Sequence, residues 1–436
     1  MILGDLSMNL ERFFQLCNPA TTLNVANPSD KNLYIDFSSV RSGNLISEFM
    51  RTIKLHNQSF TCQFFSGHIG CGKTTELLRL KSELEAEKYH VVYFESSEFL
   101  DFSDVDITDI LLLIVRKISE SMKESGLNIN PGYFQTLFKN ISGLFSDLQL
   151  EHIEFNMGLT TISTKLKDSN SMRKKLRAEL EPRTDNIIDS INEEVLKAAN
   201  EKIKSIGKKG LVVIIDNLDR IYNVYKTKRR TQPEYIFIDR GDQLQRLFCH
   251  LVYTIPLALT FSNDASTITN RCGKPKTLSM VPILARDGKT YFKKSMSLMQ
   301  EMILARAFPD LSSEERFKRI KNIFEPEILL TKICLASGGH VRNLLNLVYT
   351  CLSKYDPPFT TKIYNEVIRE FRDDLVRKID PNEWEMLKHV QKNQTVVGEK
   401  DFKELLRGMF VFEYHDKDGV WYGVNPLLKG ARQLNT

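Results

Sequence analysis

Long hydrophobic runs and paired-cysteine motifs are both missing from this sequence. The segment 109–115 (DILLLIV) is far shorter than the ~20 apolar residues that a membrane-spanning helix needs. The first residues, MILGDLSMNLERFF, do not form a charged region followed by a long apolar stretch, so they do not resemble a secretion signal. The seven cysteines are odd in number, and none stands in C-x-x-C spacing. We therefore expect a cytoplasmic protein with reduced thiols and no zinc site, disulfide framework or membrane contact.

The sequence also lacks a strong excess of charge of one sign. It has 60 Lys and Arg against 55 Asp and Glu, which gives a net charge of +5. This small excess permits nucleic acid as a partner but does not argue for it. With 42% hydrophobic and 26% charged residues, the composition is ordinary for a globular protein. The length of 436 residues predicts two or three domains of ~150 residues each.

A phosphate-binding loop is clearly present. The stretch 60–78, FTCQFFSGHIGCGKTTELL, reads as a strand, a glycine-rich bend and a helix, and it fits G-x-x-x-x-G-K-[ST] at every fixed position. Because a strand and a helix flank the bend, a chance glycine turn is a poor explanation. In this motif backbone N–H groups and the helix N-terminus bind the phosphates, the lysine reaches the β- and γ-phosphates, and the hydroxyl binds Mg²⁺. The predicted nucleotide contacts are Gly67, His68, Ile69, Gly70, Cys71, Gly72, Lys73, Thr74 and Thr75, with Lys73 also counted as catalytic.

A second segment predicts the metal-binding carboxylate. Residues 211–215 (LVVII) are typical of a strand buried on both faces, and Asp216 follows at its C-terminal end, where ligands bind in parallel sheets. We expect Asp216 to hold Mg²⁺ together with Thr74, although a solvated aspartate at a strand end is the alternative. Further strands are expected at 90–95, 250–261 and 276–283, with helices at 73–87 and 104–121 between the first of them.

Two other segments are candidates for contact with nucleotide. The polar end of the expected strand 250–261 favours Asn263, and after it Ser262, as a contact to the γ-phosphate or the attacking water. Upstream of the loop, residues 34–41 (YIDFSSVR) fit either a contact on the adenine side or an edge strand with a solvated arginine.

Residues 122–206 interrupt the strand–helix alternation and are expected to form an insertion. The segment 148–166 alternates apolar and polar residues, which is typical of strands, and 172–206 is charged and helical with a break at Glu181 and Pro182. The basic patch at 173–177 (RKKLR) fits a solvated helix face better than a contact to a phosphate backbone.

Helices are expected at 295–307, 313–323, 326–336 and after Gly338-Gly339. The paired glycines with Arg342 fit equally an arginine aimed at a phosphate and a simple helix C-cap with a surface arginine. Short helices at 384–390 and 402–407 then precede a hairpin whose turn signal is Asp418-Gly419, the outline of a winged helix. The expected domains are an ATPase core at 1–290, a helical lid at 291–375 and a winged helix at 376–436.

In their order along the chain, these motifs resemble the AAA+-related STAND and KAP-type P-loop ATPases and the initiator (origin-recognition) AAA+ ATPases. The motifs concerned are G-x-x-G-x-G-K-T-T at 67–75, hhhhD-x-x-D-R at 211–220, the polar residues 262–263, G-G-x-x-R at 338–342 and the terminal hairpin. The resemblance implies an α/β fold with a RecA-like αβα core, ATP and Mg²⁺ as cofactors, and switching between closed and oligomeric states. It also implies that Asn263 is the sensor-1 residue, Arg342 the sensor-2 arginine, and Arg220 or Arg240 an arginine finger.

Two features depart from that pattern. AAA+ hydrolases usually carry Asp-Glu where this chain has Asp216-Asn217, so we expect slow hydrolysis with Asp219 orienting the water. No residues remain for a fused effector domain, so the prediction is a homo-oligomeric ATPase switch that controls a separately encoded effector protein, in a bacterial antiphage defence system. The alternative is a DNA-binding initiator or transposition-type loader whose winged helix grips duplex DNA. The acidic hairpin tip, DKD at 416–418, favours the effector reading. A metabolic kinase is disfavoured because no acceptor-substrate motif is visible.

Overall fold

The computed structural model describes residues 8–41, 43–56, 58–129, 131–142, 155–396 and 400–435. It divides into two compact units, each with its own hydrophobic core. The sheet unit comprises Ile46–Ser66 and Leu80–Lys276, and the P-loop unit comprises Met1–Leu45, Gly67–Arg79 and Thr277–Thr436. The three domains expected from the sequence, with limits at 290 and 375, stay a prediction.

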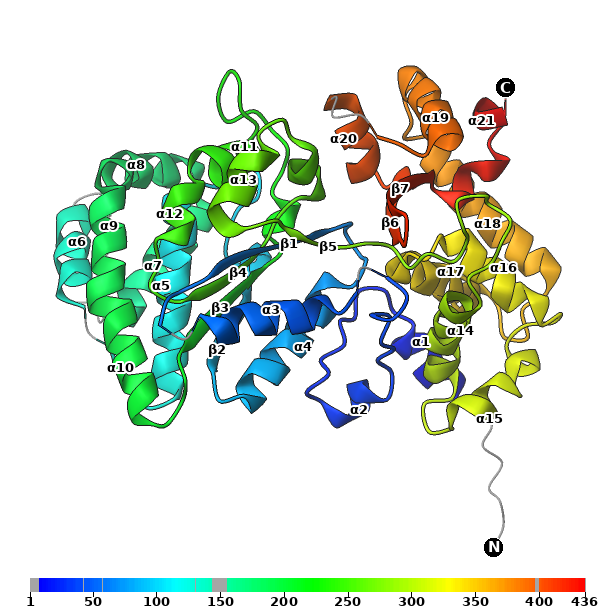
Figure 1. Cartoon of the computed structure of the whole chain (residues 1–436), viewed down its shortest axis with the longest axis horizontal. Coiled ribbons are helices and arrows are strands. Elements are labelled where there is room, and N and C mark those ends of the chain that lie inside the picture. Colours follow the sequence, from blue (N-terminus) through cyan, green and yellow to red (C-terminus); the bar gives the residue numbers. More distant parts are fainter. Residues whose placement is uncertain are drawn as a thin grey trace, which may run out of the picture. The chain divides into compact units, whose positions relative to one another are not determined.

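A five-stranded sheet forms the centre of the sheet unit. Its strands are β1 (Cys62–Gly67), β2 (His90–Glu95), β3 (Leu211–Asp216), β4 (His250–Thr254) and β5 (Lys276–Leu278), in the order β2-β3-β4-β1-β5. The pairs β2–β3, β3–β4 and β4–β1 are parallel, so β1, β3 and β4 end at the same edge (Figure 1). β4 lies between β1 and β3 in this order.

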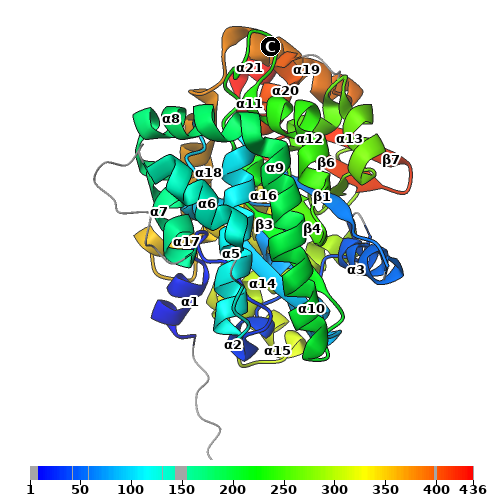
Figure 2. The same cartoon turned by 90° about the vertical axis from the view of Figure 1, so that its left-hand side faces the viewer.

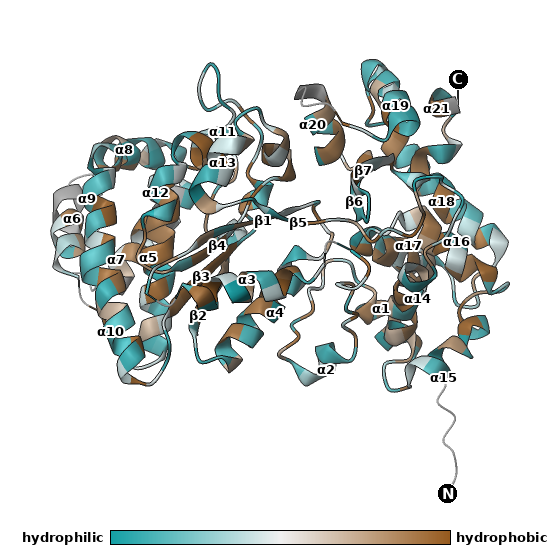
Figure 3. Ribbon diagram, in the orientation of Figure 1, coloured by the Kyte–Doolittle hydropathy of each residue, from teal (hydrophilic) through white to brown (hydrophobic). Residues whose placement is uncertain are grey.

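Helices cover both faces of this sheet because its strands are apolar on both sides. Successive residues of a strand point to opposite faces. Phe65 makes an edge contact with Phe49 of α3 (Leu45–Leu55), whereas Phe64 contacts Phe237 and Tyr253 in the main core. Figure 2 looks onto this second face, which α5 and its neighbouring helices cover, and Figure 3 shows the apolar colour of β3. The α/β fold with a parallel sheet between helical layers is therefore confirmed.

The remaining helices of the sheet unit follow the strands. They are α5 (Ile107–Glu124), α6 (Gly132–Ser142), α7 (Phe155–Asp168), α8 (Asn170–Leu180), α9 (Thr184–Ser190), α10 (Lys197–Ser205), α11 (Gln232–Glu234), α12 (Gly241–Gln245) and α13 (Ala265–Cys272). The break expected near Glu181-Pro182 is present as a short 3₁₀ turn, Glu181–Arg183, between α8 and α9.

The interpretation of the alternating segment 148–166 as strand-like is wrong where the structure describes it. Residues Phe155–Asp168 form the helix α7, which packs against α5 and α8, and residues 148–154 lie outside the described part. Leu159 and Ile162 are fully buried, and their spacing of three is that of one helix face. The buried residues of this segment therefore have helical spacing. Their packing against α5 and α8 stabilises the helix despite the alternating pattern in the sequence.

The P-loop unit is mainly helical and ends in a hairpin. Its helices are α1 (Leu10–Leu16), α2 (Pro28–Lys31), the start of α4 (Lys73–Ala86), α14 (Lys293–Ala307), α15 (Ser313–Phe317), α16 (Ile328–Ser337), α17 (Val341–Lys354), α18 (Thr361–Val376), α19 (Pro381–Asn393), α20 (Lys400–Arg407) and α21 (Arg432–Asn435). The hairpin pairs β6 (Val411–Asp416) with β7 (Gly419–Val424) in antiparallel register, with Asp416 opposite Gly419. The predicted hairpin is present, with its two-residue turn at Lys417-Asp418.

Within the described ranges, no helix has the length and apolar content of a bilayer-spanning segment.

Candidate nucleotide-binding site

The loop between β1 and α4 has the conformation expected of a phosphate cradle. Gly70 and Gly72 have φ angles of +86° and +106°, which favour glycine. The helix α4 begins at Lys73, directly after the bend. The Lys73 ammonium turns back over the loop and donates hydrogen bonds to the backbone oxygens of Gly67 (2.8 Å) and His68 (2.9 Å). A cation held over the loop in this way is well placed for a phosphate anion.

The first turn of α17 lies against this loop. The His340 ring bonds the Ile69 backbone oxygen at 2.9 Å and accepts a hydrogen bond from the Asn343 backbone N–H, so its other nitrogen is the donor. The Arg342 backbone N–H donates to the Gly70 oxygen at 3.3 Å. A Cβ at Gly70 would lie 2.8 Å from His340 Cε1 and 2.9 Å from Arg342 Cβ. The structure thus brings Arg342 to the predicted loop.

Gly338 and Gly339 explain how α17 reaches the loop. Gly338 ends α16 in the left-handed conformation, with φ of +62°, as a helix C-cap does. A Cβ on Gly339 would overlap the backbone oxygen of Val281. The glycine pair therefore caps α16 as expected and brings the backbone of Arg342 beside the loop, whereas a phosphate contact by Arg342 stays a prediction.

The C-terminal hairpin contacts the other side of the same loop. The Glu413 backbone N–H of β6 donates to His68 Nε2 at 2.9 Å. The ring of Phe412 packs edge-on against His68 and stacks on His340, at centroid distances of 5.8 and 5.7 Å. Burial lowers the pKa of His68 to about 3 and that of His340 to about 4. The nearby positive charge of Lys73 also lowers the pKa of both rings. Neutral rings are required here because a protonated His68 could not accept the Glu413 N–H.

A small cavity of about 80 Å³ lies beside the loop, within the P-loop unit. The Arg41 guanidinium donates to the Cys71 oxygen at 3.0 Å and lies 3.7 Å from the Glu76 carboxylate, which accepts from the Tyr34 hydroxyl at 3.0 Å. The pKa of Glu76 is raised because burial disfavours the charged carboxylate, and the nearby Arg41 guanidinium offsets only part of this effect. The remaining lining residues include Leu33, Ile35, Phe37, Gly72, Thr75, Met302, Arg306, Val341 and Leu345.

The structure excludes one of the two interpretations of residues 34–41. The segment forms no strand, so the edge-strand alternative is wrong, and four of its residues line a mostly apolar pocket next to the loop. Cys71 is buried and lines the same pocket, so it faces the interior. The contact of this segment with the adenine side of a nucleotide stays a prediction.

In the sheet unit, Asp216 stands at the end of β3 and is almost fully buried. Its carboxylate accepts hydrogen bonds from the Tyr93 hydroxyl (3.2 Å) and the Asn217 backbone N–H (2.6 Å). Its side chain is thereby oriented at the edge where β1 also ends. Asp219 lies nearby in the buried 3₁₀ turn Leu218–Arg220.

One acidic residue was not singled out from the sequence. Glu95, at the end of β2, is paired in register with Asp216, and its carboxylate accepts a 2.5 Å hydrogen bond from the Asn217 side chain. Asn217 has φ of +67°, a conformation in which asparagine is enriched. The end of the sheet therefore holds a carboxylate–amide pair, in which Glu95 of β2 supplies the carboxylate and Asn217 supplies the amide. The signal in the sequence was the acid that closes the strand 90–95.

Asn263 is not at the end of β4. The predicted strand 250–261 stops at Thr254, and a 3₁₀ segment at Leu257–Phe261 separates it from the exposed Asn263. Pro256 explains the early end, because proline cannot donate within a ladder. The polar residue at the strand end is Thr254, whose hydroxyl accepts from the Leu218 N–H (3.0 Å) and donates to the Ile215 oxygen (3.4 Å).

The candidate arginine fingers differ in their surroundings. Arg240 donates to Glu181 at 2.9 Å and lies over the ring of Tyr235, so it is held within its own unit. Arg220 closes the turn after Asp219 and is half-buried.

The basic patch at 173–177 was expected to be a solvated helix face, and this is wrong for its two arginines, which are buried in ion pairs. Arg173 bonds Asp101 at 2.7 Å, and Arg177 bonds Asp104 at 2.7 Å and also the buried Asp109. These arginines join α8 to the start of α5, leaving Lys174 and Lys175 exposed.

Comparison with protein-family models gives no match, and neither does comparison with curated proteins. Among solved structures, the chain is similar to the ORC1 protein of Aeropyrum pernix in complex with DNA, at 11% identity over 94% of this chain and 93% of that chain, with a TM-score of 0.37. It is similar to Cdc6p from Pyrobaculum aerophilum at 12% identity over 93% and 97%, with a TM-score of 0.37. The Aeropyrum pernix ORC2 protein gives 9% identity over 90% and 91%, again at 0.37. These scores are low, so the fold assignment rests on the strand order and on the loop.

Proposed function

We propose that this chain binds ATP and hydrolyses it slowly, and that nucleotide at the loop changes how the hairpin β6–β7 is held. The observation that carries the proposal is the conformation of the loop, with the Lys73 ammonium bonded over it and α4 beginning at that residue. The cavity beside the loop would take the adenine ring. Mg²⁺ would bind the nucleotide phosphates and the Thr74 hydroxyl, and would neutralise charge on the transferred phosphate.

The second half of the proposal rests on contacts to the loop backbone. His68, Ile69 and Gly70 each bond a residue of β6 or of the first turn of α17. Movement of these loop residues on phosphate binding would therefore act on the hairpin without an intervening element. Release of the hairpin in one nucleotide state is a simple way to control assembly with a partner or with further copies of this chain.

The test is calorimetric ATP binding and turnover for the wild type and Lys73→Ala. The variant should lose ATP binding, whereas Lys81→Ala, in the same helix, should keep it. Hydrogen exchange at the Glu413 amide should change on addition of ATP to the wild type only. An unchanged ATP affinity in Lys73→Ala would contradict the binding site, and an unchanged Glu413 amide in saturated wild type would contradict the coupling.

The partner is either a separately encoded effector protein or duplex DNA. Asp416 of the tip is neutralised by Arg286, and Lys417 stands beside Asp418, so the tip offers no net positive charge to a phosphate backbone, which favours a protein surface. In α20, Arg407 pairs with Glu404, which reduces its charge for phosphate contacts. Binding to a DNA duplex that weakens steeply with salt would identify the chain as an initiator-type loader instead. An ATP-dependent change in particle size, lost in Lys73→Ala, would support the switch.

A further inference from the structure

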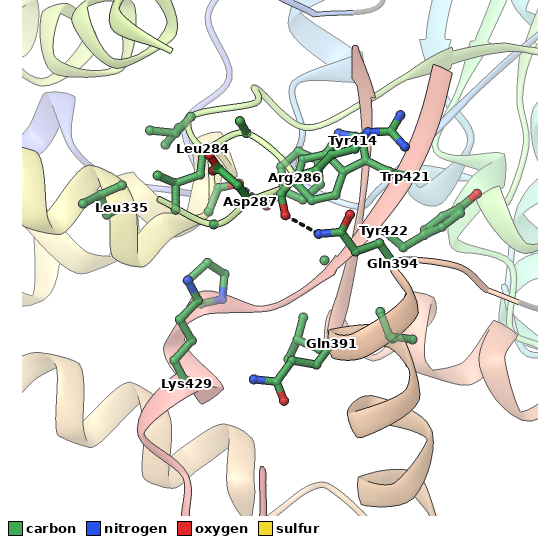
Figure 4. Close-up of a pocket in the computed structure, with 18 of the residues that line it drawn as sticks. Leu284, Arg286, Asp287, Leu335, Gln391, Gln394, Tyr414, Trp421, Tyr422 and Lys429 are labelled. Atoms are coloured by element: carbon green, nitrogen blue, oxygen red, sulfur yellow. Dashed lines mark hydrogen bonds between the residues drawn. The ribbon is translucent and has the colours of Figure 1, made fainter. Parts of the chain in front are cut away.

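A cavity of about 300 Å³ lies in the P-loop unit beside the hairpin β6–β7. Figure 4 shows Tyr414 and Trp421 along one side of it, and these two rings stack at a centroid distance of 4.4 Å. Two polar groups that line the cavity are bonded within the protein, since the Gln394 amide donates to the Arg286 backbone oxygen and the Tyr414 hydroxyl donates to the Gly338 oxygen. These contacts fix the hairpin, whereas a surface with exposed groups suited to a partner lies in the sheet unit.

That surface is formed by residues 222–230 (YNVYKTKRR), which lie between the turn Leu218–Arg220 and the short helix α11 (Figure 1). We call them the basic loop, because they include four lysines and arginines and no acidic residue. Tyr222, Val224 and Tyr225 are 50%, 44% and 61% exposed, so three large apolar or aromatic side chains reach the surface within four residues. Exposed groups of this kind that lie close together commonly mark an interaction site.

The basic loop is held in a defined conformation by its own backbone. Tyr225 and Thr231 form an antiparallel bridge, and the Lys226 N–H donates to the Arg230 oxygen at 2.9 Å. The Thr227 hydroxyl accepts a hydrogen bond from the Arg230 N–H at 3.1 Å. Because the loop is already ordered in this way, a partner would bind it at a low cost in conformational entropy.

The two inner cations of the basic loop, Lys226 and Arg230, are neutralised by the rest of the sheet unit. Lys226 bonds Asp104 at 2.7 Å. Arg230 lies 3.1 Å from Asp239 and also bonds Asp264. These ion pairs attach the base of the loop to the body of the unit, and they add no net charge to the surface.

The two outer cations, Lys228 and Arg229, lie in the turn at the tip of the basic loop. Both are exposed, and neither has an ion-pair partner within the part of the chain that the structure describes. The aspartates at the base of the loop are already paired with the inner cations, so the charge of the tip is positive. The loop therefore presents two accessible cations a few residues from two exposed tyrosines.

We propose that the basic loop binds single-stranded nucleic acid. Tyr222 and Tyr225 would stack on bases, and Lys228 and Arg229 would contact the phosphates of the same strand. Stacking on aromatic side chains, beside cations that follow the backbone, is how proteins bind single strands without sequence preference.

Other acidic partners would use less of this surface. In a duplex the bases are stacked on one another and are not available to the tyrosines, and an acidic protein segment offers no bases. The basic loop belongs to the sheet unit, and its binding to a strand does not depend on nucleotide at the loop 67–75. The inference therefore goes beyond the proposed function and is tested without ATP.

The test is the anisotropy of a fluorescein-labelled oligothymidylate of about 20 nucleotides, longer than the ~4–16 nucleotides that one single-strand-binding module covers. We expect saturable binding by the full chain that weakens as salt rises from about 50 to 200 mM. The same strand paired with oligodeoxyadenylate should bind at least about tenfold more weakly, because its bases cannot stack on the tyrosines. Undetectable binding of the single strand, equal affinity for the duplex, or equally strong competition by polyglutamate would overturn the proposal.

A double variant of the tip locates the phosphate contacts. Lys228→Gln with Arg229→Gln should weaken binding about tenfold and should lower the slope of log K against log salt by about 1.4, since each contact to a single strand contributes ~0.7. The matched control, Lys174→Gln with Lys175→Gln, removes two exposed charges from α8 and should change neither quantity. Equal weakening in the two double variants would contradict the assignment to the basic loop.

Tyr222 separates stacking from charge. Tyr222→Ala should weaken binding at least about fivefold without changing the salt slope, because it removes a ring and no cation. Tyr222→Phe keeps the ring and should bind as the wild type does. Since Tyr222 is half exposed, both variants should fold, which circular dichroism checks. Wild-type affinity in Tyr222→Ala would show that the strand does not stack on this ring.

Discussion

The Asn217 side chain donates a 2.5 Å hydrogen bond to the Glu95 carboxylate, joining the ends of two neighbouring strands. Asn217 stands where AAA+ hydrolases usually carry a glutamate directly after the aspartate. In this chain a glutamate, Glu95, is instead supplied by the adjacent strand β2. Glu95 is half-buried at the edge of the sheet where Asp216 stands, so it is a candidate to orient or deprotonate water alongside Asp219.

Glu95→Gln should therefore lower the turnover number for ATP by about 10²-fold, because general-base catalysis contributes at least that much. ATP affinity should change little, since the carboxylate is not expected to contact the nucleotide before reaction. Steady-state hydrolysis and equilibrium binding measure the two quantities. Glu98→Gln is the matched control, as Glu98 is an exposed glutamate three residues on.

Asp219→Asn tests the competing assignment with the same assays. If Asp219→Asn abolishes turnover and Glu95→Gln does not, Asp219 is the residue that orients the water. Wild-type turnover in both variants would show that neither carboxylate acts on it.

Gly70→Ala should abolish nucleotide binding and destabilise the P-loop unit. The added Cβ would meet His340 and Arg342 at less than 3.0 Å, and the backbone has φ of +86°, so both sterics and conformation oppose it. Gly126→Ala is the control that measures the cost of the backbone conformation alone, because Gly126 has φ of +73° and an added Cβ would have no atom within 4 Å. We expect a cost of about 1–2 kcal/mol for Gly126→Ala and clearly more for Gly70→Ala in chemical denaturation. Equal costs would mean that α17 does not press on the loop.

Much of the fold was predictable because local patterns and packing agree. The loop 67–75 and the strand ending at Asp216 are marked by glycine positions and by an apolar run, and both lie where the sequence places them. The end of β4 could have been found as well, since Pro256 cannot continue a strand in the interior of a sheet.

Other features depend on partners far along the chain. Nothing in RKKLR reveals that Arg177 pairs with Asp104 and Asp109, which lie about 70 positions upstream. The hydrogen bond between His68 and Glu413 joins residues 345 positions apart, and no sequence motif around either residue predicts it. Such pairings are set by tertiary packing, which periodicity does not describe.

Thr254→Val should disturb the turn that carries Asp219 more than Asn263→Ala does. Valine keeps the shape of threonine but leaves the buried Leu218 N–H without its acceptor, which costs about 1–3 kcal/mol of unfolding free energy. Asn263 is exposed, so its truncation should cost little stability. Denaturation and ATP turnover of both variants provide the comparison. A loss of turnover confined to Asn263→Ala would restore Asn263 as the γ-phosphate sensor.

The buried histidines at the loop should make stability fall in mild acid. Burial lowers the pKa of His68 to about 3 and that of His340 to about 4, against 6.5 for an ordinary solvated histidine. Between pH 6.5 and 4 the unfolded chain therefore binds protons that the folded chain does not. Each histidine then contributes a decrease of about 1.4 kcal/mol in unfolding free energy per pH unit as pH falls, and nothing above pH 7.

His68→Gln checks this prediction, since its amide oxygen can accept the Glu413 N–H without titrating. Denaturation at pH 5 and pH 7.5 should show a smaller difference for His68→Gln than for the wild type, by about 2 kcal/mol. The exposed His56 provides the control, and His56→Gln should keep the wild-type difference. The same fall in the variant as in the wild type would mean that His68 is protonated in the folded protein. In that case its ring could not accept the bond that joins the loop to the hairpin.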